Sequence, residues 1–500
     1  MSIRRQSIIS SILVYIGMGL GFFNTYLYAK GFSETEYGIV GAFQAFATLI
    51  LSFSNLGISY YIYKFYPYYK DNLAPKENDM ITLALLVGFA GFLLVMTGGL
   101  VFKDYFIRKY NEHSPEVVQY YYWLFPFGFG FSIYTILEAF AWQLRKSVFT
   151  TFTKEILFRL LATILIVLLS FHFIKDFDLF IKIYAFTYLG IAVTLVIYLI
   201  VTRQLHFTFT ISRVTKKFRK KIISTCLLVW GGFMVVNISS VFDTLVIGAV
   251  VKEGMKYVGI YTLAQNMSSL VFAPQRALSA AAISHLSQAW KDKDLGRINR
   301  IYQRSSINQL IFGLAIYLLI WLNFTDGVLT LHLKPGYLDA RIVFLFIGLT
   351  KVIDMGTGLN SQIIGTSIYW RVEFFSGVIL LLLTLPLNYL LTLDLKELGP
   401  AVANLFAIIV YNGIRYFFLL KKFKLQPFTR QTVYSLLLAA ACFVICFLLF
   451  DSFQGFVWLV LRSAVFCLLY ATGVLYFKLT PDVLPVWDTI KKRLAKIVQQ

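Results

Sequence analysis

The sequence predicts an all-α integral membrane protein with about fourteen transmembrane helices. Of its 500 residues, 58% are hydrophobic and 14% are charged, whereas soluble domains are about half apolar and about a quarter charged. Apolar stretches of about 20 residues, the length that spans a bilayer, recur along the whole chain. Lys and Arg concentrate in the termini and in alternate loops, as the positive-inside rule expects when both termini are cytoplasmic.

The first apolar stretch follows Arg4 and Arg5 and covers residues 8–29. It is longer than the apolar core of a signal peptide and no small-residue cleavage site closes it, so we interpret it as a retained first helix. The other stretches that we interpret as membrane helices cover residues 38–60, 80–102, 117–142, 153–174, 180–201, 222–250, 257–282, 305–325, 340–363, 372–392, 398–420, 431–451 and 456–477.

Two stretches of the sequence resemble each other at a constant separation, each just after a short charged loop. The corresponding positions are Gly38 and Gly259, Ile39 and Ile260, Gln44 and Gln265, and Asn55 and Arg276. We therefore predict two six-helix lobes related by pseudo-symmetry, followed by two further helices and a basic cytoplasmic tail. The predicted boundaries are 1–201 for the first lobe, 202–221 for a basic cytoplasmic linker, 222–424 for the second lobe and 425–500 for the C-terminal part.

The predicted linker, residues 202–221, carries the densest positive charge of the chain. It is interpreted either as an amphipathic segment on the anionic inner leaflet or as a plain topology signal. The net charge of +21 would indicate nucleic-acid binding in a soluble protein, but basic cytoplasmic loops explain it in a membrane protein. We expect membrane lipids, and no nucleic acid, among its partners.

We find no motif for catalysis or for metal binding. The five histidines are scattered, mainly in loops, and neither a nucleophile elbow nor a phosphate-binding loop is found. Glu34 and Glu36 form an acidic pair in the first outer loop, as in some membrane glycosyltransferases, but no outer loop is long enough for the outer domain of such an enzyme. We expect a protein that is not an enzyme and needs no cofactor or metal. Without an ATPase motif, active transport would use an ion gradient or the substrate gradient.

Charged side chains inside membrane helices are energetically costly and usually face a cavity or a partner. Several such residues have a local explanation. The pairs one helical turn apart, which we expect to interact, are Glu155 with Arg159 and Lys351 with Asp354. The residues near helix ends, which we expect to extend towards the interface, are Arg341 and Arg462. The charged residues that lack such an explanation are Arg276, Asp243, Glu138 and Arg415.

Polar residues on two corresponding helices indicate a polar path. Gln44 and Asn55 are three helical turns apart and share a face, and Gln265 and Arg276 have the same spacing. Transporters built from repeats bind their substrates between such helices. For Arg276 we weigh a cation that holds an anionic group in a central cavity against a buried pair with Asp243.

Tyrosines crowd the inner end of the second predicted helix, at Tyr60, Tyr61, Tyr63, Tyr66, Tyr68 and Tyr69. An interfacial aromatic belt explains them well. The alternative is a surface on which sugar rings stack.

Two stretches carry a resemblance to a known family. The first runs from 31–38 (GFSETEYG) through 54–58 (SNLGI) to 64–67 (KFYP), and the second includes 243–248 (DTLVIG) and 258–264 (VGIYTLA). They resemble the polysaccharide flippases, often called Wzx-like or O-antigen flippases, of the multidrug/oligosaccharidyl-lipid/polysaccharide exporter superfamily. The resemblance implies two six-helix lobes around a central cavity, with helices one, two, seven and eight lining the substrate portal.

The resemblance also implies a function in the cell inner membrane. Members of this family move undecaprenyl-pyrophosphate-linked oligosaccharides to the outer leaflet by alternating access, for O-antigen, capsule or exopolysaccharide export. A polysaccharide polymerase and export machinery are candidate partners. The alternatives are a lipid II flippase of peptidoglycan synthesis, a cation-coupled multidrug exporter and, outside transporters, a membrane polysaccharide polymerase or transferase.

A cationic cavity suits this cargo because the pyrophosphate is an anion. Arg276 is the first candidate for binding it, and Lys351 and Arg415 are further candidates. Asp243 and Glu138 are the candidates for coupling a proton or a sodium ion.

Overall fold

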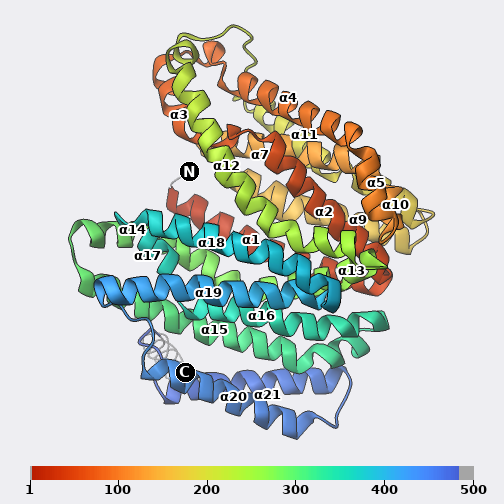
Figure 1. Cartoon of the computed structure of the whole chain (residues 1–500), viewed down its shortest axis with the longest axis vertical. Coiled ribbons are helices and arrows are strands. Elements are labelled where there is room, and N and C mark those ends of the chain that lie inside the picture. The colour runs from red at the N-terminus through yellow and green to blue at the C-terminus, as the bar shows by residue number, and fades with distance from the viewer. Residues whose placement is uncertain (1–2, 483–500) are drawn as a thin grey trace, which may run out of the picture. The chain divides into compact units, whose positions relative to one another are not determined.

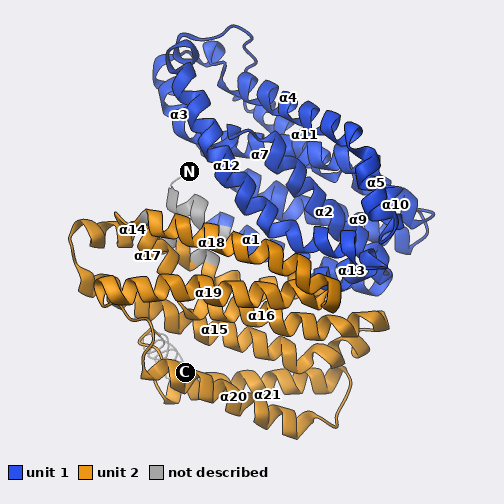
Figure 2. Ribbon diagram, viewed as in Figure 1, with its two compact units in different colours: residues 1–262 blue, residues 263–500 orange. Residues whose placement is uncertain are grey.

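The computed structural model describes residues 3–482 and shows only helices and loops within them (Figure 1). The side chains not described within that range are those of residues 3–8, 11, 276, 277, 280, 281, 284 and 370. The chain divides into two compact units, Met1–Thr262 and Leu263–Gln500, and the division falls inside one helix (Figure 2). The predicted lobe boundaries are not tested by this division and stay a prediction.

Unit 1 contains the first thirteen α-helices, the last of which continues into unit 2. They are α1 (Ile3–Gly31), α2 (Glu34–Ser54), α3 (Ile58–Asn72), α4 (Met80–Val101), α5 (Lys103–Asn111), α6 (Pro115–Val118), α7 (Leu124–Gln143), α8 (Ser147–Thr151), α9 (Phe158–Ser170), α10 (Phe177–Tyr184), α11 (Thr187–Val201), α12 (Arg213–Val250) and α13 (Gly254–Val271). The short 3-10 and π segments of this unit are η1 (Pro75–Glu77), η2 (Tyr121–Trp123) and the π-helical η3 (Phe152–Leu157).

Unit 2 contains the remaining helices. They are α14 (Ala273–Lys291), α15 (Leu295–Thr330), α16 (Ala340–Gly356), α17 (Asn360–Gly365), α18 (Trp370–Leu395), α19 (Leu398–Phe423), α20 (Arg430–Phe450) and α21 (Phe456–Tyr476), with the 3-10 segment η4 (Pro335–Asp339).

Among the described residues, 11 helical segments are long and apolar enough to cross a membrane, so the protein is a multi-pass membrane protein. The predicted stretches without such a segment are 153–174, 257–282 and 340–363. Each coincides with an interrupted helix: a π-helical turn precedes α9, Pro274 opens α14 after α13, and Gly358 with φ of 67° separates α16 from α17. The count of fourteen stays a prediction.

The second predicted helix is two helices. Residues 38–60 were expected to form one helix, but α2 ends at Ser54, and Leu56 and Gly57 have φ values of 47° and 76°. Asn55 therefore caps the C-terminus of α2, and its side chain donates a hydrogen bond to Ser59 Oγ of α3 at 3.0 Å. The left-handed backbone at two successive residues ends the helix, and apolar periodicity does not reveal such an interruption.

The corresponding glycines Gly38 and Gly259 face each other where α2 crosses α13. A Cβ atom on either glycine would lie 3.0 Å from the backbone nitrogen of the other. The same added atom on Gly38 would collide with the carbonyl of Met255, and on Gly259 with the carbonyl of Glu34. Met255 and Glu34 are themselves corresponding positions of the repeat. This reciprocal contact supports the pseudo-symmetry inferred from the sequence.

The predicted linker is an extended segment followed by the first turns of α12. Ser212 caps α12, and Asp79 accepts hydrogen bonds from the Ser212 amide at 2.9 Å and from Thr215 Oγ1 at 2.8 Å. The basic residues from Arg213 onward therefore belong to a helix of 38 residues that continues into the predicted membrane segment. Asp79 is 1% exposed, so this anchor fixes the start of α12 against the N-terminus of α4.

Helices α20 and α21 pack on α15 through a buried ion pair. Arg462 Nη1 lies 2.7 Å from Asp326 Oδ2, and their side chains are 7% and 8% exposed. Arg462 also donates to the carbonyls of Phe450 and Phe453, at the end of α20. The expectation that Arg462 extends towards the interface is wrong, because its partner and these carbonyls satisfy the charge inside the bundle.

Candidate functional site

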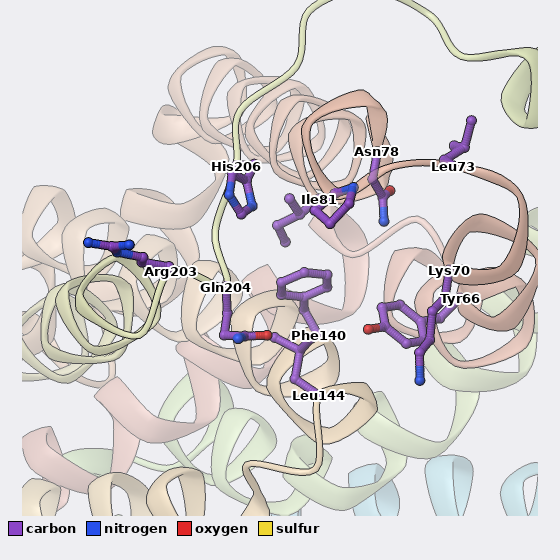
Figure 3. Close-up of a pocket in the computed structure, with 11 residues that line it drawn as sticks. Tyr66, Lys70, Leu73, Asn78, Ile81, Phe140, Leu144, Arg203, Gln204 and His206 are labelled. Carbon is purple, nitrogen blue, oxygen red and sulfur yellow. The ribbon is translucent and has the colours of Figure 1, made fainter.

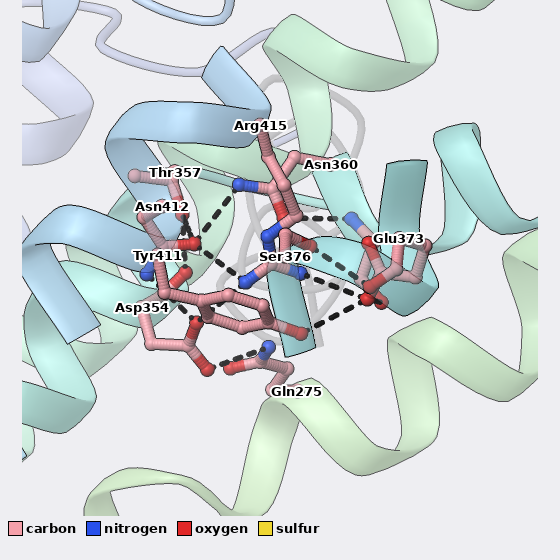
Figure 4. Close-up of polar contacts among 10 residues, drawn as sticks. Gln275, Asp354, Thr357, Asn360, Glu373, Ser376, Tyr411, Asn412 and Arg415 are labelled. Carbon is pink, nitrogen blue, oxygen red and sulfur yellow. Dashed lines mark hydrogen bonds and ion pairs between the residues drawn. The ribbon is translucent and has the colours of Figure 1, made fainter. Parts of the chain in front are cut away.

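Arg415 of α19 lies at the centre of a polar cluster inside unit 2 (Figure 4). It is 2% exposed. Its guanidinium lies 3.4 Å from Glu373 Oε1 of α18 and 3.9 Å from Asp354 Oδ1 of α16. Its Cζ atom lies 3.5 Å from the centroid of the Tyr411 ring, one turn earlier on α19. Three helices thus contribute charges that converge on one buried cation.

Asn412 connects the two sides of the cluster. Its Oδ1 accepts hydrogen bonds from Arg415 Nη2 at 2.9 Å, from Asn360 Nδ2 at 3.0 Å and from Thr357 Oγ1 at 3.1 Å. Its Nδ2 donates to Asp354 Oδ1 at 3.0 Å. Because a buried amide with this many partners has one orientation, Asn412 holds the Asp354 carboxylate near the guanidinium.

The Glu373 carboxylate forms the other end of the cluster. Its Oε1 accepts from Ser361 Oγ at 2.6 Å and from the Tyr411 hydroxyl at 3.0 Å. Its Oε2 is buried and has no hydrogen-bond partner within the described part of the chain. On the Asp354 side, Gln275 of α14 donates to Oδ2 at 3.5 Å, and the Gln275 Oε1 atom also has no partner there. These unsatisfied oxygens are positions at which a proton, a cation or water would be stabilised.

The interruption between α16 and α17 makes the cluster possible. Gly358 adopts a left-handed conformation, and a Cβ there would lie 3.0 Å from Ser305 Oγ and 3.1 Å from the Ser306 nitrogen. The turn brings Thr357 and Asn360 towards Asn412 of α19. Broken helices in membrane proteins place polar groups in the apolar interior without leaving the backbone exposed to lipid.

The charges of the cluster do not balance. It contains two carboxylates and one guanidinium, so it carries an excess negative charge when all three are ionised. The Asp354 and Glu373 side chains are 21% and 22% exposed, whereas that of Arg415 is 3% exposed. Asp354 and Glu373 are therefore the more accessible charged side chains of the cluster, and carboxylates bind protons and cations. Sequence reasoning instead placed Arg415 among the residues that bind an anion.

The structure describes the side chains of two of the three other predicted substrate-binding residues of the second half. Arg276 lies on α14 next to Gln275, and its side chain is outside the described residues. Gln265 of α13 is partly exposed. Lys351 of α16 is also partly exposed, and its ammonium lies 5.1 Å from the centroid of the Phe272 ring. Asp354, which was expected to pair with Lys351, contacts Asn412 and Arg415.

In unit 1, Gln44 is held by tyrosines. Its Nε2 donates to the Tyr184 hydroxyl at 2.7 Å, and its Oε1 accepts from the Tyr188 hydroxyl at 3.3 Å. Asn55 is 2% exposed at the break between α2 and α3. Both polar side chains thus have partners inside unit 1.

The two predicted coupling acids of unit 1 are buried and engaged. Asp243 of α12 is 6% exposed and accepts a hydrogen bond from the Tyr261 hydroxyl of α13. Glu138 of α7 is 7% exposed, and its Oε2 lies 3.1 Å from Lys154 Nζ in the π-helical turn η3. π-Helical turns often occur at functional sites. The expected Glu155–Arg159 pair is confirmed: Arg159 Nη2 lies 2.9 Å from Glu155 Oε2.

The tyrosines at the end of the second predicted helix all lie on α3 and differ in burial. Tyr61 and Tyr69 are buried and hydrogen-bonded to each other at 2.8 Å. Tyr66 instead lines a pocket of about 390 Å³ with Phe140, Asn78 and basic and amide side chains (Figure 3). The other residues of the pocket wall are Lys70, Leu73, Pro75, Ile81, Leu144, Arg203, Gln204 and His206. An aromatic ring beside amide and basic groups is a chemistry that suits a sugar ring.

Asp354 and Glu373 are the site residues that sequence reasoning missed. Both were visible as charges within apolar stretches, but the spacing of Asp354 and Lys351 offered a local explanation. Asn360 and Asn412, also in apolar stretches, were a further signal of a shared polar site. No group of three or more His, Cys, Asp or Glu side chains in the described part of the chain could hold a metal ion.

Comparisons with known proteins identify the family. The family model described as "Polysaccharide biosynthesis protein" matches residues 3–286. No curated protein sequence matches the chain.

The fold has known counterparts among solved structures. The lipid II flippase MurJ, in an inward closed conformation, has 16% sequence identity and a TM-score of 0.68, with 94% of this chain and 99% of that chain covered. An inward-facing multidrug resistance MATE family transporter of the MOP superfamily has 15% identity and a TM-score of 0.61, with 82% of this chain and 96% of that chain covered. Because the family model covers more than half of the chain, this protein belongs to the polysaccharide biosynthesis protein family.

Proposed function

We propose that this protein is a flippase that moves undecaprenyl-pyrophosphate-linked oligosaccharide units from the cytoplasmic to the outer leaflet of the cell inner membrane. The match to the polysaccharide biosynthesis protein family over residues 3–286 carries this proposal. The protein acts by alternating access, with both termini cytoplasmic, and is not an enzyme. Its cargo is used for O-antigen, capsule or exopolysaccharide export.

The cluster around Arg415 couples transport to an ion. Two partly exposed carboxylates, Asp354 and Glu373, share one buried guanidinium, so uptake of one proton or one Na⁺ balances the charge. Neutralising a carboxylate weakens its attraction to Arg415, which loosens the contact between α16, α18 and α19. Asp243 and Glu138 are the coupling candidates of unit 1.

The pyrophosphate is bound by cations other than Arg415. Arg276 of α14 and Lys351 of α16 are the proposed ligands, with Gln265 as a polar neighbour on α13. Within unit 1, Gln44 and Asn55 are the proposed polar contacts of the substrate. Lys351 is partly exposed and carries a charge that a phosphate can reach. The proposed role of Arg415 is to be the fixed counter-charge of Asp354 and Glu373.

The alternative substrate is lipid II, and the structural similarity to MurJ over 94% of the chain favours it as the second candidate. Both substrates are polyprenyl pyrophosphates that carry sugars, so the cationic ligands proposed above fit either. They differ in the sugar and peptide portions. Competition between the two lipids in one transport assay distinguishes them.

Reconstituted vesicles test the function directly. Purified protein in vesicles should expose a fluorescent undecaprenyl-pyrophosphate oligosaccharide to an impermeant quencher, and protein-free vesicles should not. In cells, deletion of the gene should cause lipid-linked repeat units to accumulate on the cytoplasmic face. Normal arrival of these units at the outer face in the deletion strain would overturn the proposal.

The coupling role is tested with matched carboxylate variants. Asp354→Asn and Glu373→Gln should each abolish the response of flipping to an imposed proton or Na⁺ gradient. Asp394→Asn is the control, because Asp394 is an exposed acid on the same helix as Glu373. A gradient response in Asp354→Asn and Glu373→Gln equal to that of the control would show that the cluster does not couple.

A further inference from the structure

A pocket of about 550 Å³ lies in unit 2 between α14, the first turns of α15 and the residues after α21. It is separate from the Arg415 cluster. Its lining combines basic, polar and apolar side chains. They are Leu278, Ala282 and His285 of α14, Arg297, Arg300, Ile301, Arg304, Ser305 and Asn308 of α15, and Leu359 and Asp482.

Three arginines form one basic face of α15. Arg297, Arg300 and Arg304 are three and four residues apart, so they lie on the same side of the helix. Arg304 pairs with Asp482. The Arg297 and Arg300 guanidinium groups contact no acceptor among the side chains and backbone that the structure describes. Arg297 is partly exposed and Arg300 is exposed. A guanidinium group can form two parallel hydrogen bonds to a phosphate or carboxylate, so two such groups beside a cavity favour an anionic ligand.

An anion of the chain itself already lies in the pocket. The Asp482 carboxylate accepts a hydrogen bond from Arg304 through Oδ1 and from Asn308 Nδ2 at 2.6 Å through Oδ2. Thr480 donates to Asn308 Oδ1 and accepts from the Asp482 amide, which orients both groups. The donors of the pocket therefore converge on a position that an oxyanion can occupy.

Part of the pocket wall is apolar. Ala282 and Leu359 are 8% and 1% exposed and belong to the hydrophobic core between α14, α15 and α19, with Leu278 and Ile301 packed against it. A free inorganic anion gains nothing from such a wall. A phosphate attached to a hydrocarbon chain gains both the charge-assisted hydrogen bonds and the burial of apolar area.

The length of α15 places the arginines at headgroup level. Its 36 residues extend about 54 Å, whereas the hydrocarbon core is about 30 Å thick. The arginines lie in the first three turns, next to the charged turn between α14 and α15. In the predicted topology this end faces the cytoplasm, where anionic lipid headgroups concentrate.

We propose that this pocket binds the phosphate group of a membrane lipid, and that Asp482 is an internal anion that competes for it. The arginines contact the phosphate, and the apolar wall contacts the adjoining hydrocarbon. Displacement of Asp482 frees Arg304 and Asn308 for the lipid. The site stands on this geometry alone and does not depend on the proposed flipping.

Binding of farnesyl pyrophosphate to the purified full-length protein, measured by titration calorimetry in detergent, tests the site. Wild-type protein should bind this probe, and the double variant Arg297→Gln/Arg300→Gln should bind it at least tenfold more weakly. Asp482→Asn should bind it several-fold more tightly, because the competing charge is removed. Arg430→Gln is the control, since Arg430 is an exposed arginine at the start of α20 outside the pocket.

Three results would overturn the proposal. They are equal affinity of the double variant and the Arg430→Gln control, weaker binding by Asp482→Asn than by wild type, and binding of inorganic pyrophosphate as tight as that of the lipid probe. The last result would identify a site for free phosphate. Gel filtration of each variant checks that it is folded. Because no transport is measured, failure of the flippase proposal leaves these results unaffected.

Discussion

Replacing Arg415 with methionine should destabilise unit 2 by about 3 kcal/mol. Removing one partner of a buried ion pair typically costs about 3–5 kcal/mol, because the other charge stays buried and unpaired. Here Asp354 and Glu373 are 21% and 22% exposed, so water reduces the cost to the lower end of that range. The Tyr411 ring, 3.5 Å from Arg415 Cζ, loses a cation–π contact of about 1 kcal/mol, which is included in the total.

Titration with SDS in mixed micelles, followed by tryptophan fluorescence, measures this loss. The Arg415→Met/Glu373→Gln double variant should recover about 1–2 kcal/mol, because one of the two uncompensated charges is removed. It should still fail to respond to an ion gradient. Arg430→Met serves as the control for loss of an exposed arginine. An unfolding midpoint of Arg415→Met equal to that of the control would refute the argument that Arg415 balances the two acids.

Three further variants test the packing. Gly38→Ala should prevent accumulation of folded protein, because the added methyl collides with the backbone of α13, whereas Gly19→Ala, where no atom lies within 4 Å, should express like wild type on a fluorescence size-exclusion profile. Asp326→Asn should lower the free energy of unfolding in SDS by about 3 kcal/mol, since Arg462 is then a buried cation without its counter-charge. An unchanged unfolding midpoint would mean that the surrounding carbonyls alone stabilise Arg462. Gly358→Ala should cost about 1 kcal/mol or more in the same titration, because φ is 67° there, and an unchanged midpoint would exclude strain at that turn.

The fold class followed from composition because an apolar chain with short loops has few alternatives. A bilayer leaves no water to satisfy the backbone, so stretches of about 20 apolar residues become helices whatever their neighbours. The predicted repeat is supported by Gly38 and Gly259, because their close contact leaves no room for a side chain at either position. The helix interruptions could not be predicted from the sequence. Leu56, Gly57 and Gly358 interrupt helices through their backbone conformation, while the surrounding apolar pattern continues.

The candidate site was also predicted only in part from the sequence. The sequence by itself identified the charges within apolar stretches, since each is too costly to bury without a partner. Local spacing correctly paired Glu155 with Arg159, which lie on one helix. It did not identify the partners of Arg415 and Arg462, because Glu373 and Asp326 lie on other helices.

The sequence alone determined that this protein spans a membrane and that Arg415 and Asp354 need partners. Only the tertiary structure decided that these two residues belong to one cluster with an excess of carboxylate. The reason is physical: the cost of burying a charge depends on the residue, but its compensation depends on which helices pack together. The role of Arg415 consequently changed from a proposed ligand of the pyrophosphate to the counter-charge of Asp354 and Glu373.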